Sequence, residues 1–308
     1  MRFSCRAHRI GLVLVGVSVA AIWLGGCGGG EEPAIGTRKR PLEIAVPVAE
    51  RKTPLAHFIK ERTGLVCREV RTATLSELLD LLDKEKVDVL IVSAPVYAVA
   101  SEPYGLLAIM KAKRGATIET RGMILVRADR GLVTVKDAAE LTVAAVGPTS
   151  VPGCLLQRAL VTEQEAAPSK VTYLGDEAAV VRAVYHGEAD LGFVEWRLDE
   201  ARRPADARAL VARDVPDILE AVVPLAVTSA VPHDAVAVRA RVPDAVRTEL
   251  VRALEEFAKD SHGRAYLGEH YGIEGLVPSD DAEYAEFRTE LKAAGITLAD
   301  LLPEEEAN

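Results

Sequence analysis

Residues 141–155 read LTVAAVGPTSVPGCL, and this stretch decides the fold. Its first six residues are apolar and partly β-branched, which predicts a buried strand. A Gly-Pro pair ends that strand, Thr149 or Ser150 can cap a following helix, and Pro152 suits a first helical turn. The stretch therefore predicts a strand, a tight loop and a helix start, with backbone N–H groups of residues 149–153 directed at the carboxyl edge of a sheet.

A leader precedes the fold. Residues 10–24 are apolar and uncharged, follow three arginines, and are too short for a stable membrane span. They end in Leu-Gly-Gly-Cys27, which resembles the lipobox of bacterial lipoproteins. We therefore predict a signal peptide over residues 1–26 and lipidation of Cys27, which anchors the chain on the extracytoplasmic side of a membrane. A single-pass anchor or ordinary secretory cleavage is the alternative.

Composition limits the class of protein. The 308 residues are enough for two domains, and a net charge of −9 with 5% aromatic residues argues against a nucleic-acid partner. After cleavage of the signal peptide and acylation of Cys27, the unmodified cysteines are Cys67 and Cys154. No Cys/His spacing indicates a metal site and nothing supports a disulfide, so we expect two free thiols, no metal and no cofactor.

From residue 41 the pattern is α/β, with apolar strand-like runs alternating with helical ones. We expect a mostly parallel sheet flanked by helices in each of two lobes. Lobe one should comprise residues 41–127 and 222–303, and lobe two residues 128–221, with hinges near Arg127 and Ala226. Residues 27–40 are predicted to be a disordered tether and residues 304–308 an acidic tail.

The order of several short motifs over nearly the whole chain resembles the substrate-binding proteins of ABC transporters, in particular the phosphate/phosphite/phosphonate-binding group. The motifs are VDV at 87–89 with Tyr97, VRADRG at 126–131, GPTSVPG at 147–153, AVYHGEAD at 183–190, VPH at 231–233, and YGI at 271–273 followed by Tyr284. The resemblance implies a class II periplasmic-binding-protein fold with two crossover strands. It also implies a small-molecule ligand between the lobes, an ABC permease or membrane sensor as partner, and a monomer without enzymatic activity.

The sequence departs from this group at the expected ligand positions. Tyr97 matches, but the Ser-Thr-Ser run of the phosphonate binders corresponds here to Ser150-Val151-Pro152. A family histidine corresponds to Asp176, and a family tyrosine to Thr120. Because a carboxylate close to a phosphoryl group is repulsive, we expect a small polar solute. The resemblance favours a phosphonate-like oxyanion as the ligand, and an amine or zwitterion is the second candidate.

The candidate ligand-binding residues lie at helix starts and strand ends. A simpler role is open for several of them, namely helix capping, core packing or solvation. The candidates are Tyr97, Thr120, Arg121, Thr149, Ser150, Val151, Gly153, Asp176, Glu195 and Trp196.

Catalysis is not expected. The sequence contains no GxSxG, HExxH, Walker or GxGxxG motif. Cys154 lies near a predicted helix start and could act as a nucleophile, but no histidine is placed to serve it. We therefore expect a lipid-anchored solute receptor for transport, with a sensory lipoprotein, whose bound form is recognised by a membrane kinase or cyclase, as the alternative.

Overall fold

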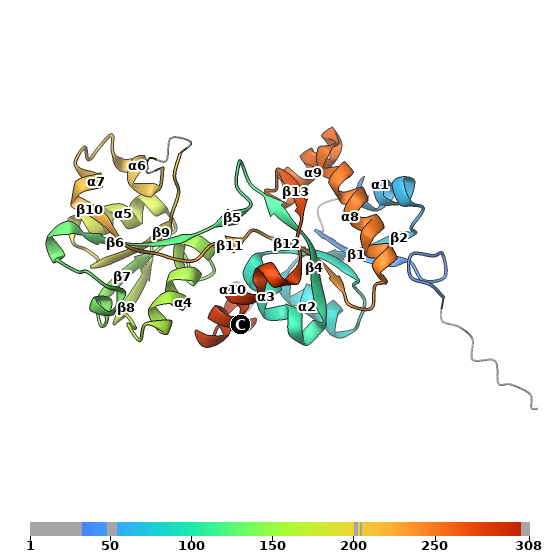
Figure 1. Ribbon diagram of the computed structural model, residues 1–308, viewed down its shortest axis with the longest axis horizontal. Coiled ribbons are helices and arrows are strands. Elements are labelled where there is room, and N and C mark those ends of the chain that lie inside the picture. Colours follow the sequence, from blue (N-terminus) through green and yellow to red (C-terminus); the bar gives the residue numbers. More distant parts are fainter. Residues whose placement is uncertain (1–32, 48–53, 200–202, 204, 303–308) are drawn as a thin grey trace, which may run out of the picture. The chain divides into compact units, whose positions relative to one another are not determined.

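The computed structural model describes residues 33–47, 54–199, 203 and 205–302 (Figure 1). The predicted signal peptide, Cys27 and the acidic tail lie outside these residues. The described residues form a six-stranded sheet, a five-stranded sheet and a two-stranded sheet. We call the six-stranded sheet with its helices lobe one, and the five-stranded sheet with its helices lobe two. None of the helices in the described ranges has the length and apolar character needed to cross a membrane.

Lobe one is built on the sheet β13-β4-β12-β3-β1-β2. β1 pairs in parallel with β2 and β3, whereas β12 is antiparallel to β3 and β4, and β13 is antiparallel to β4. The strands are β1 (Leu42–Pro47), β2 (Cys67–Thr72), β3 (Val89–Val92), β4 (Leu106–Lys113), β12 (Ala235–Arg239) and β13 (Gly275–Pro278). All residues of β12 are buried, as expected for a strand covered on both faces.

Helices cover both faces of this sheet. One core contains Ile59, Leu250 and Phe257, and is formed with α1 (Pro54–Thr63), α8 (Asp244–Lys259) and α9 (Ser261–Tyr271). The opposite core contains Leu78 and Phe287, and is formed with α2 (Leu75–Asp83), α3 (Ala94–Tyr104) and α10 (Ala285–Ala293). The short turns η4 (Asp281–Tyr284) and η5 (Ala299–Leu301) flank α10.

Lobe two is built on the sheet β10-β6-β9-β7-β8. Its strands are β6 (Gly122–Arg127), β7 (Thr142–Ala145), β8 (Lys170–Tyr173), β9 (Leu191–Glu195) and β10 (Val222–Val227). Its helical elements are η1 (Ala128–Arg130), η2 (Val135–Ala138), η3 (Val151–Leu155), α4 (Leu156–Glu163), α5 (Glu177–His186), α6 (Ala207–Val211) and α7 (Ile218–Ala221). One apolar core lies between the sheet and α5, α6 and α7, and another between the sheet and η3 and α4.

Two chain segments cross between the sheets. We call residues 114–121 the first crossing segment and residues 228–234 the second. They pair through β5 (Glu119–Thr120) and β11 (Val231–Pro232), which are antiparallel. Beside lobe two, the Gly122 N–H donates to Thr228 Oγ1 at 2.8 Å and the Thr228 N–H donates to the Gly122 carbonyl at 3.0 Å. The crossing segments are thus bonded to each other along their length.

The predicted two-lobed α/β architecture is present, with corrections to its boundaries. β6 and β10 were assigned to lobe one, but they pair with each other in the sheet of lobe two. The chain therefore crosses near residues 119–121 and 228–231 and not near Arg127 and Ala226. Each sheet is also mixed instead of mostly parallel, because β12 and β6 run against their neighbours.

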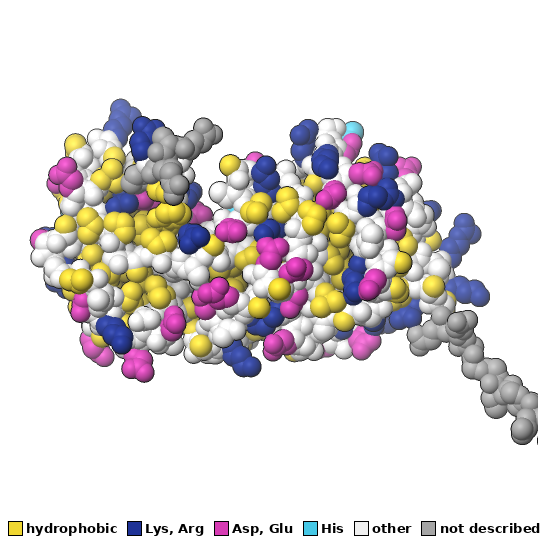
Figure 2. All heavy atoms as spheres, viewed as in Figure 1, with side chains coloured by type: hydrophobic (Ala, Val, Ile, Leu, Met, Phe, Trp, Pro, Cys, Tyr) yellow, Lys and Arg dark blue, Asp and Glu magenta, His cyan; other side chains and the backbone are white. Residues whose placement is uncertain are grey.

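The predicted disordered tether is also shorter than expected. Ile35 is 7% exposed and lies in the core shared with α8. The Val66 N–H donates to the Gly36 carbonyl at 2.7 Å, which ties this segment to the entry of β2. Burial of one isoleucine and these backbone bonds give residues 33–40 a fixed place on lobe one. In the view of Figure 2, acidic and basic side chains are interspersed over lobe one, and hydrophobic side chains gather over lobe two.

Candidate functional site

The opening stretch forms the strand, loop and helix start that its sequence predicts. β7 ends at Ala145, and the turn η3 leads directly into α4. Ser150 caps this turn, since its Oγ accepts from the Gly153 N–H at 3.2 Å. The Ser150 N–H itself donates to the Gly147 carbonyl at 3.1 Å. The N–H groups of Ser150 and Gly153 are therefore used inside the loop and do not point to a ligand.

Two further residues of this loop have packing roles. A Cβ on Gly153 would lie 2.6 Å from Val146 Cγ2 and 2.7 Å from Ser150 Oγ, so only glycine fits there. Val151 packs against the lobe-one core that contains Tyr97. Thr149 is exposed and lines a cavity of about 410 Å³ at the carboxyl ends of β1, β2 and β3.

Tyr97 lines none of the cavities described here, and the structure gives it a place in the core of lobe one. The side chain is fully buried in lobe one and stacks edge-on against Tyr284. Its hydroxyl donates to Asp281 and accepts from the Ala108 N–H at 2.8 Å. A tyrosine one turn into a helix packs in the core here because its hydroxyl has two partners there.

Asp176 likewise has the simpler of its two predicted roles. It is the N-cap of α5, and its carboxylate accepts from the Ala179 N–H at 2.9 Å. The side chain is exposed and lines none of the cavities described here. Helix capping is therefore sufficient to explain an aspartate at residue 176.

Thr120, Arg121, Glu195 and Trp196 do come together. They line a cavity of about 540 Å³ that we call the crossing pocket. Its walls are residues 116–121 of the first crossing segment, residues 195–198 at the end of β9, and Ala205. The Trp196 N–H donates to the Arg121 carbonyl at 2.9 Å, which continues the β6–β9 ladder into the pocket wall.

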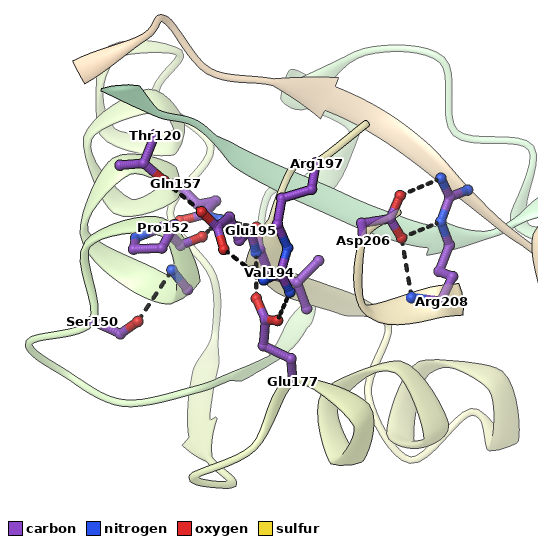
Figure 3. Close-up of polar contacts among 11 residues, drawn as sticks. Thr120, Ser150, Pro152, Gln157, Glu177, Val194, Glu195, Arg197, Asp206 and Arg208 are labelled. Atoms are coloured by element: carbon purple, nitrogen blue, oxygen red, sulfur yellow. Dashed lines mark hydrogen bonds and ion pairs between the residues drawn. The ribbon is translucent and has the colours of Figure 1, made fainter. Parts of the chain in front are cut away.

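A network of charges fixes one side of the crossing pocket (Figure 3). Glu195 accepts from the Thr120 hydroxyl at 2.9 Å and pairs with Arg197 at 3.3 Å. Glu177, the first residue of α5, pairs with Arg197 at 2.7 Å and accepts from the Glu195 N–H at 2.8 Å. Burial raises the pKa of the Glu177 carboxyl. Arg197 is therefore neutralised by two carboxylates.

Arg121 is the other cation of the crossing pocket. Its guanidinium carbon lies 5.8 Å from the centre of the Trp196 ring, and Nη1 lies 3.5 Å from the Thr228 carbonyl. Among the described residues, no carboxylate lies within 4.0 Å of this guanidinium. Arg121 can therefore pair with an anion that enters the pocket.

The comparisons with known proteins agree with this architecture. The family model for the periplasmic substrate-binding protein of phosphonate ABC transporters matches residues 41–284. The chain belongs to this phosphonate-binding family. A comparison with curated proteins gave no significant match.

The solved structures that are similar to this member of the phosphonate-binding family share little sequence with it. A protein of Xanthomonas citri bound to ATP is 16% identical with a TM-score of 0.58, covering 85% of this chain and 98% of the other. A TctC solute-binding protein from Polaromonas is 13% identical with a TM-score of 0.50, covering 86% and 99%. A binding protein component of a phosphonate transporter from Pseudomonas aeruginosa is 12% identical with a TM-score of 0.47, covering 89% and 92%.

Family membership settles the coarser predictions. The chain has the class II periplasmic-binding-protein fold and is an extracytoplasmic solute-binding protein that works with an ABC permease. It is not an enzyme. Cys154, the one candidate nucleophile, is fully buried, and burial raises the pKa of its thiol to about 11. Cys67 and Cys154 are both free thiols, as predicted.

Sequence reasoning missed three residues around the crossing pocket. Glu177 follows the predicted cap of α5, and Arg197 follows Trp196, so each adjoins a candidate that was named. Gln157 lies inside α4 on its buried side. Its signal is a polar residue at an apolar position of a helix, which requires internal hydrogen bonds. Within the described ranges, no group of histidine, cysteine or acidic side chains is arranged to hold a metal ion.

Proposed function

We propose that this chain is the lipid-anchored, monomeric solute receptor of an ABC transporter, and that the oxyanion of its ligand binds Arg121 in the crossing pocket. The observation that carries the proposal is the guanidinium of Arg121, which faces this pocket without a carboxylate partner in the described residues. The pocket's other cation, Arg197, is already paired. An anionic ligand would complete the charge balance of Arg121.

The ligand we propose is a small phosphonate-like oxyanion. A cavity of about 540 Å³ lies within the range of pockets that hold small molecules. The Trp196 ring offers an apolar surface for the organic part of an alkylphosphonate. Glu119 is exposed on the pocket wall, and its carboxylate could accept an ammonium group, which keeps a zwitterionic phosphonate as the second candidate.

A binding screen tests this proposal. The probes are phosphate, phosphite, methylphosphonate, aminoethylphosphonate, an amine osmolyte, and ATP because the Xanthomonas citri protein of similar fold is bound to it. A probe present at 100 times its Kd should add about 2.7 kcal/mol to the free energy of unfolding. If only amines stabilise the protein, the oxyanion proposal is wrong.

A pair of variants then tests the binding residue. Arg121→Gln should weaken binding of the stabilising oxyanion by about 10- to 100-fold, because a charge-assisted hydrogen bond is lost. Arg130→Gln is the matched control, since Arg130 is an arginine of lobe two that pairs with Asp190 outside the crossing pocket. Equal affinities of the two variants would contradict a role for Arg121.

The proposed membrane anchor rests on the Leu-Gly-Gly-Cys27 end of the leader. Mass spectrometry of the protein from its native membrane should find an acylated Cys27 at the N-terminus. Cys27→Ala should abolish the acylation and leave the leader uncleaved. An unmodified mature N-terminus at another residue would refute lipidation.

Coupling to transport is tested in cells. Deletion of this chain should abolish high-affinity uptake of the ligand identified in the screen. Normal uptake combined with loss of a ligand-dependent cellular response would favour the sensory alternative. Closure of the lobes is tested separately, because small-angle scattering should show compaction when the ligand is added if the crossing segments act as hinges.

A further inference from the structure

Gln157 is a fully buried polar side chain that binds three elements of lobe two. Its Nε2 lies 2.6 Å from the Pro152 carbonyl, 2.8 Å from the Val194 carbonyl and 3.3 Å from the Met123 carbonyl (Figure 3). These acceptors belong to η3, β9 and β6. Because carbonyl oxygens can only accept, the amide must direct its NH₂ group at them. The amide thus fastens the start of α4 to two neighbouring strands.

The point of attachment adjoins the crossing pocket. Met123 and Val194 are register partners in the β6–β9 ladder, and the next pair is Gly122 and Glu195. The pair after that, Arg121 and Trp196, is joined by the 2.9 Å bond from the Trp196 N–H. Gln157 therefore holds the ladder one register position before the residues that line the pocket.

Gly122 allows this close approach. A Cβ at residue 122 would lie 2.6 Å from both Cδ and Nε2 of Gln157, and 2.9 Å from Oε1. The amide cannot turn away without leaving its three acceptors, because it is enclosed in the core. The glycine and the glutamine therefore fit each other, and a side chain at either position that breaks this fit should displace the ladder.

We infer that Gln157 is a positioning residue for the crossing pocket. It does not touch the ligand, and instead fixes the strand ends that carry Arg121, Glu195 and Trp196. The part of this inference that concerns affinity rests on the proposed function. The part that concerns the geometry of the pocket does not, so the two can fail independently.

The test uses the mature protein from residue 27, in which Trp196 is the single tryptophan, because the sequence holds two and Trp23 lies in the signal peptide predicted over residues 1–26. In this background, Gln157→Met keeps the length of the side chain and removes its donors. We expect red-shifted Trp196 emission, stronger quenching by acrylamide, and about tenfold weaker binding of methylphosphonate. Val161→Ala is the control, since Val161 is buried in the same helix on the core shared with Val143. It should lower stability without changing either readout.

Two more variants keep the test decisive if Gln157→Met does not fold. Gly122→Ala should produce the same fluorescence change from the opposite side of the contact. In the double variant the two effects should not add. Gln157→Glu should resemble the wild type only at low pH, where a protonated carboxyl can still donate, and should lose the native Trp196 signal as it ionises.

The inference would be overturned if Trp196 emission stayed at the wild-type value in both Gln157→Met and Gly122→Ala while their melting temperatures fell as in Val161→Ala. Gln157 would then have a purely structural role. If the wild type binds none of the oxyanion probes, the proposed function fails. The fluorescence of the ligand-free variants then still decides whether Gln157 positions the pocket.

Discussion

Replacing Tyr97 by phenylalanine separates a core role from a ligand-binding role at this position. The variant keeps the ring and its contact with Tyr284, whose centroid lies 4.7 Å away. It removes a hydroxyl that accepts from the Ala108 N–H at 2.8 Å and donates to Asp281. Asp281 keeps its ion pair with Arg288, but the N–H of Ala108, a residue 6% exposed, loses its partner. An unsatisfied buried donor costs about 1–3 kcal/mol, so we expect about 2 kcal/mol of destabilisation.

Urea unfolding followed by circular dichroism measures this loss, and calorimetry with methylphosphonate measures the affinity. Tyr104→Phe is the control on the same helix, because its hydroxyl is half-exposed and pairs with Asp83. We expect the control to change stability by no more than about 0.5 kcal/mol. For Tyr97→Phe the affinity should stay at the wild-type value. Unchanged stability together with a tenfold loss of affinity would show that the hydroxyl serves the ligand, and would refute our assignment.

Other predictions concern the loop, the helix cap and pH. Gly153→Ala should lower stability by about 1–3 kcal/mol in thermal denaturation because its Cβ meets Val146, whereas Gly147→Ala, which meets nothing within 4 Å, should not. Asp176→Ala should cost about 1 kcal/mol and Asp176→Asn almost nothing, since asparagine also caps helices, and neither should change oxyanion affinity in calorimetry. Burial, Arg114 and Lys111 lower the pKa of His233 to about 4 from 6.5. Between pH 4 and pH 6.5 the unfolded chain therefore binds more protons at His233 than the folded chain does. The free energy of unfolding should fall by at most about 3 kcal/mol as the pH drops from 6.5 to 4. Denaturation curves of His233→Gln should lack this part of the pH dependence, and an identical profile would contradict the assignment.

Local patterns predicted the elements of this fold well and their partners less well. Apolar residues and turn residues correctly predicted the strand, loop and helix start of residues 141–155, which form β7, η3 and the start of α4, because buried strands and helix ends depend on neighbouring residues. The assignment of β6 and β10 to a lobe was wrong, since strand pairing depends on residues about a hundred positions apart. Nothing in the run GMILVR, which forms β6, distinguishes a strand of one sheet from a strand of the other.

The candidate site was predicted in part for a similar reason. Thr120, Arg121, Glu195 and Trp196 follow or precede strands at the point where the chain crosses, and topology brings them together. Tyr97 and Asp176 were named by resemblance, but their surroundings give them other partners. The hydroxyl of Tyr97 finds Asp281, which lies far along the sequence, and that contact cannot be read from helical spacing.

The pairing of β6 with β10 has a consequence for the order in which the lobes can be completed. Lobe two is one continuous segment, and Met123 at its start pairs with Val227 at its end. It interrupts lobe one between β4 and β12, which are direct neighbours in their sheet. A chain emerging from its N-terminus has all the strands of lobe two after residue 227, when lobe one still lacks β12 and β13. Synthesis of lobe one therefore begins first and ends last, and β4 has no strand partner in its sheet until all of lobe two has been synthesised.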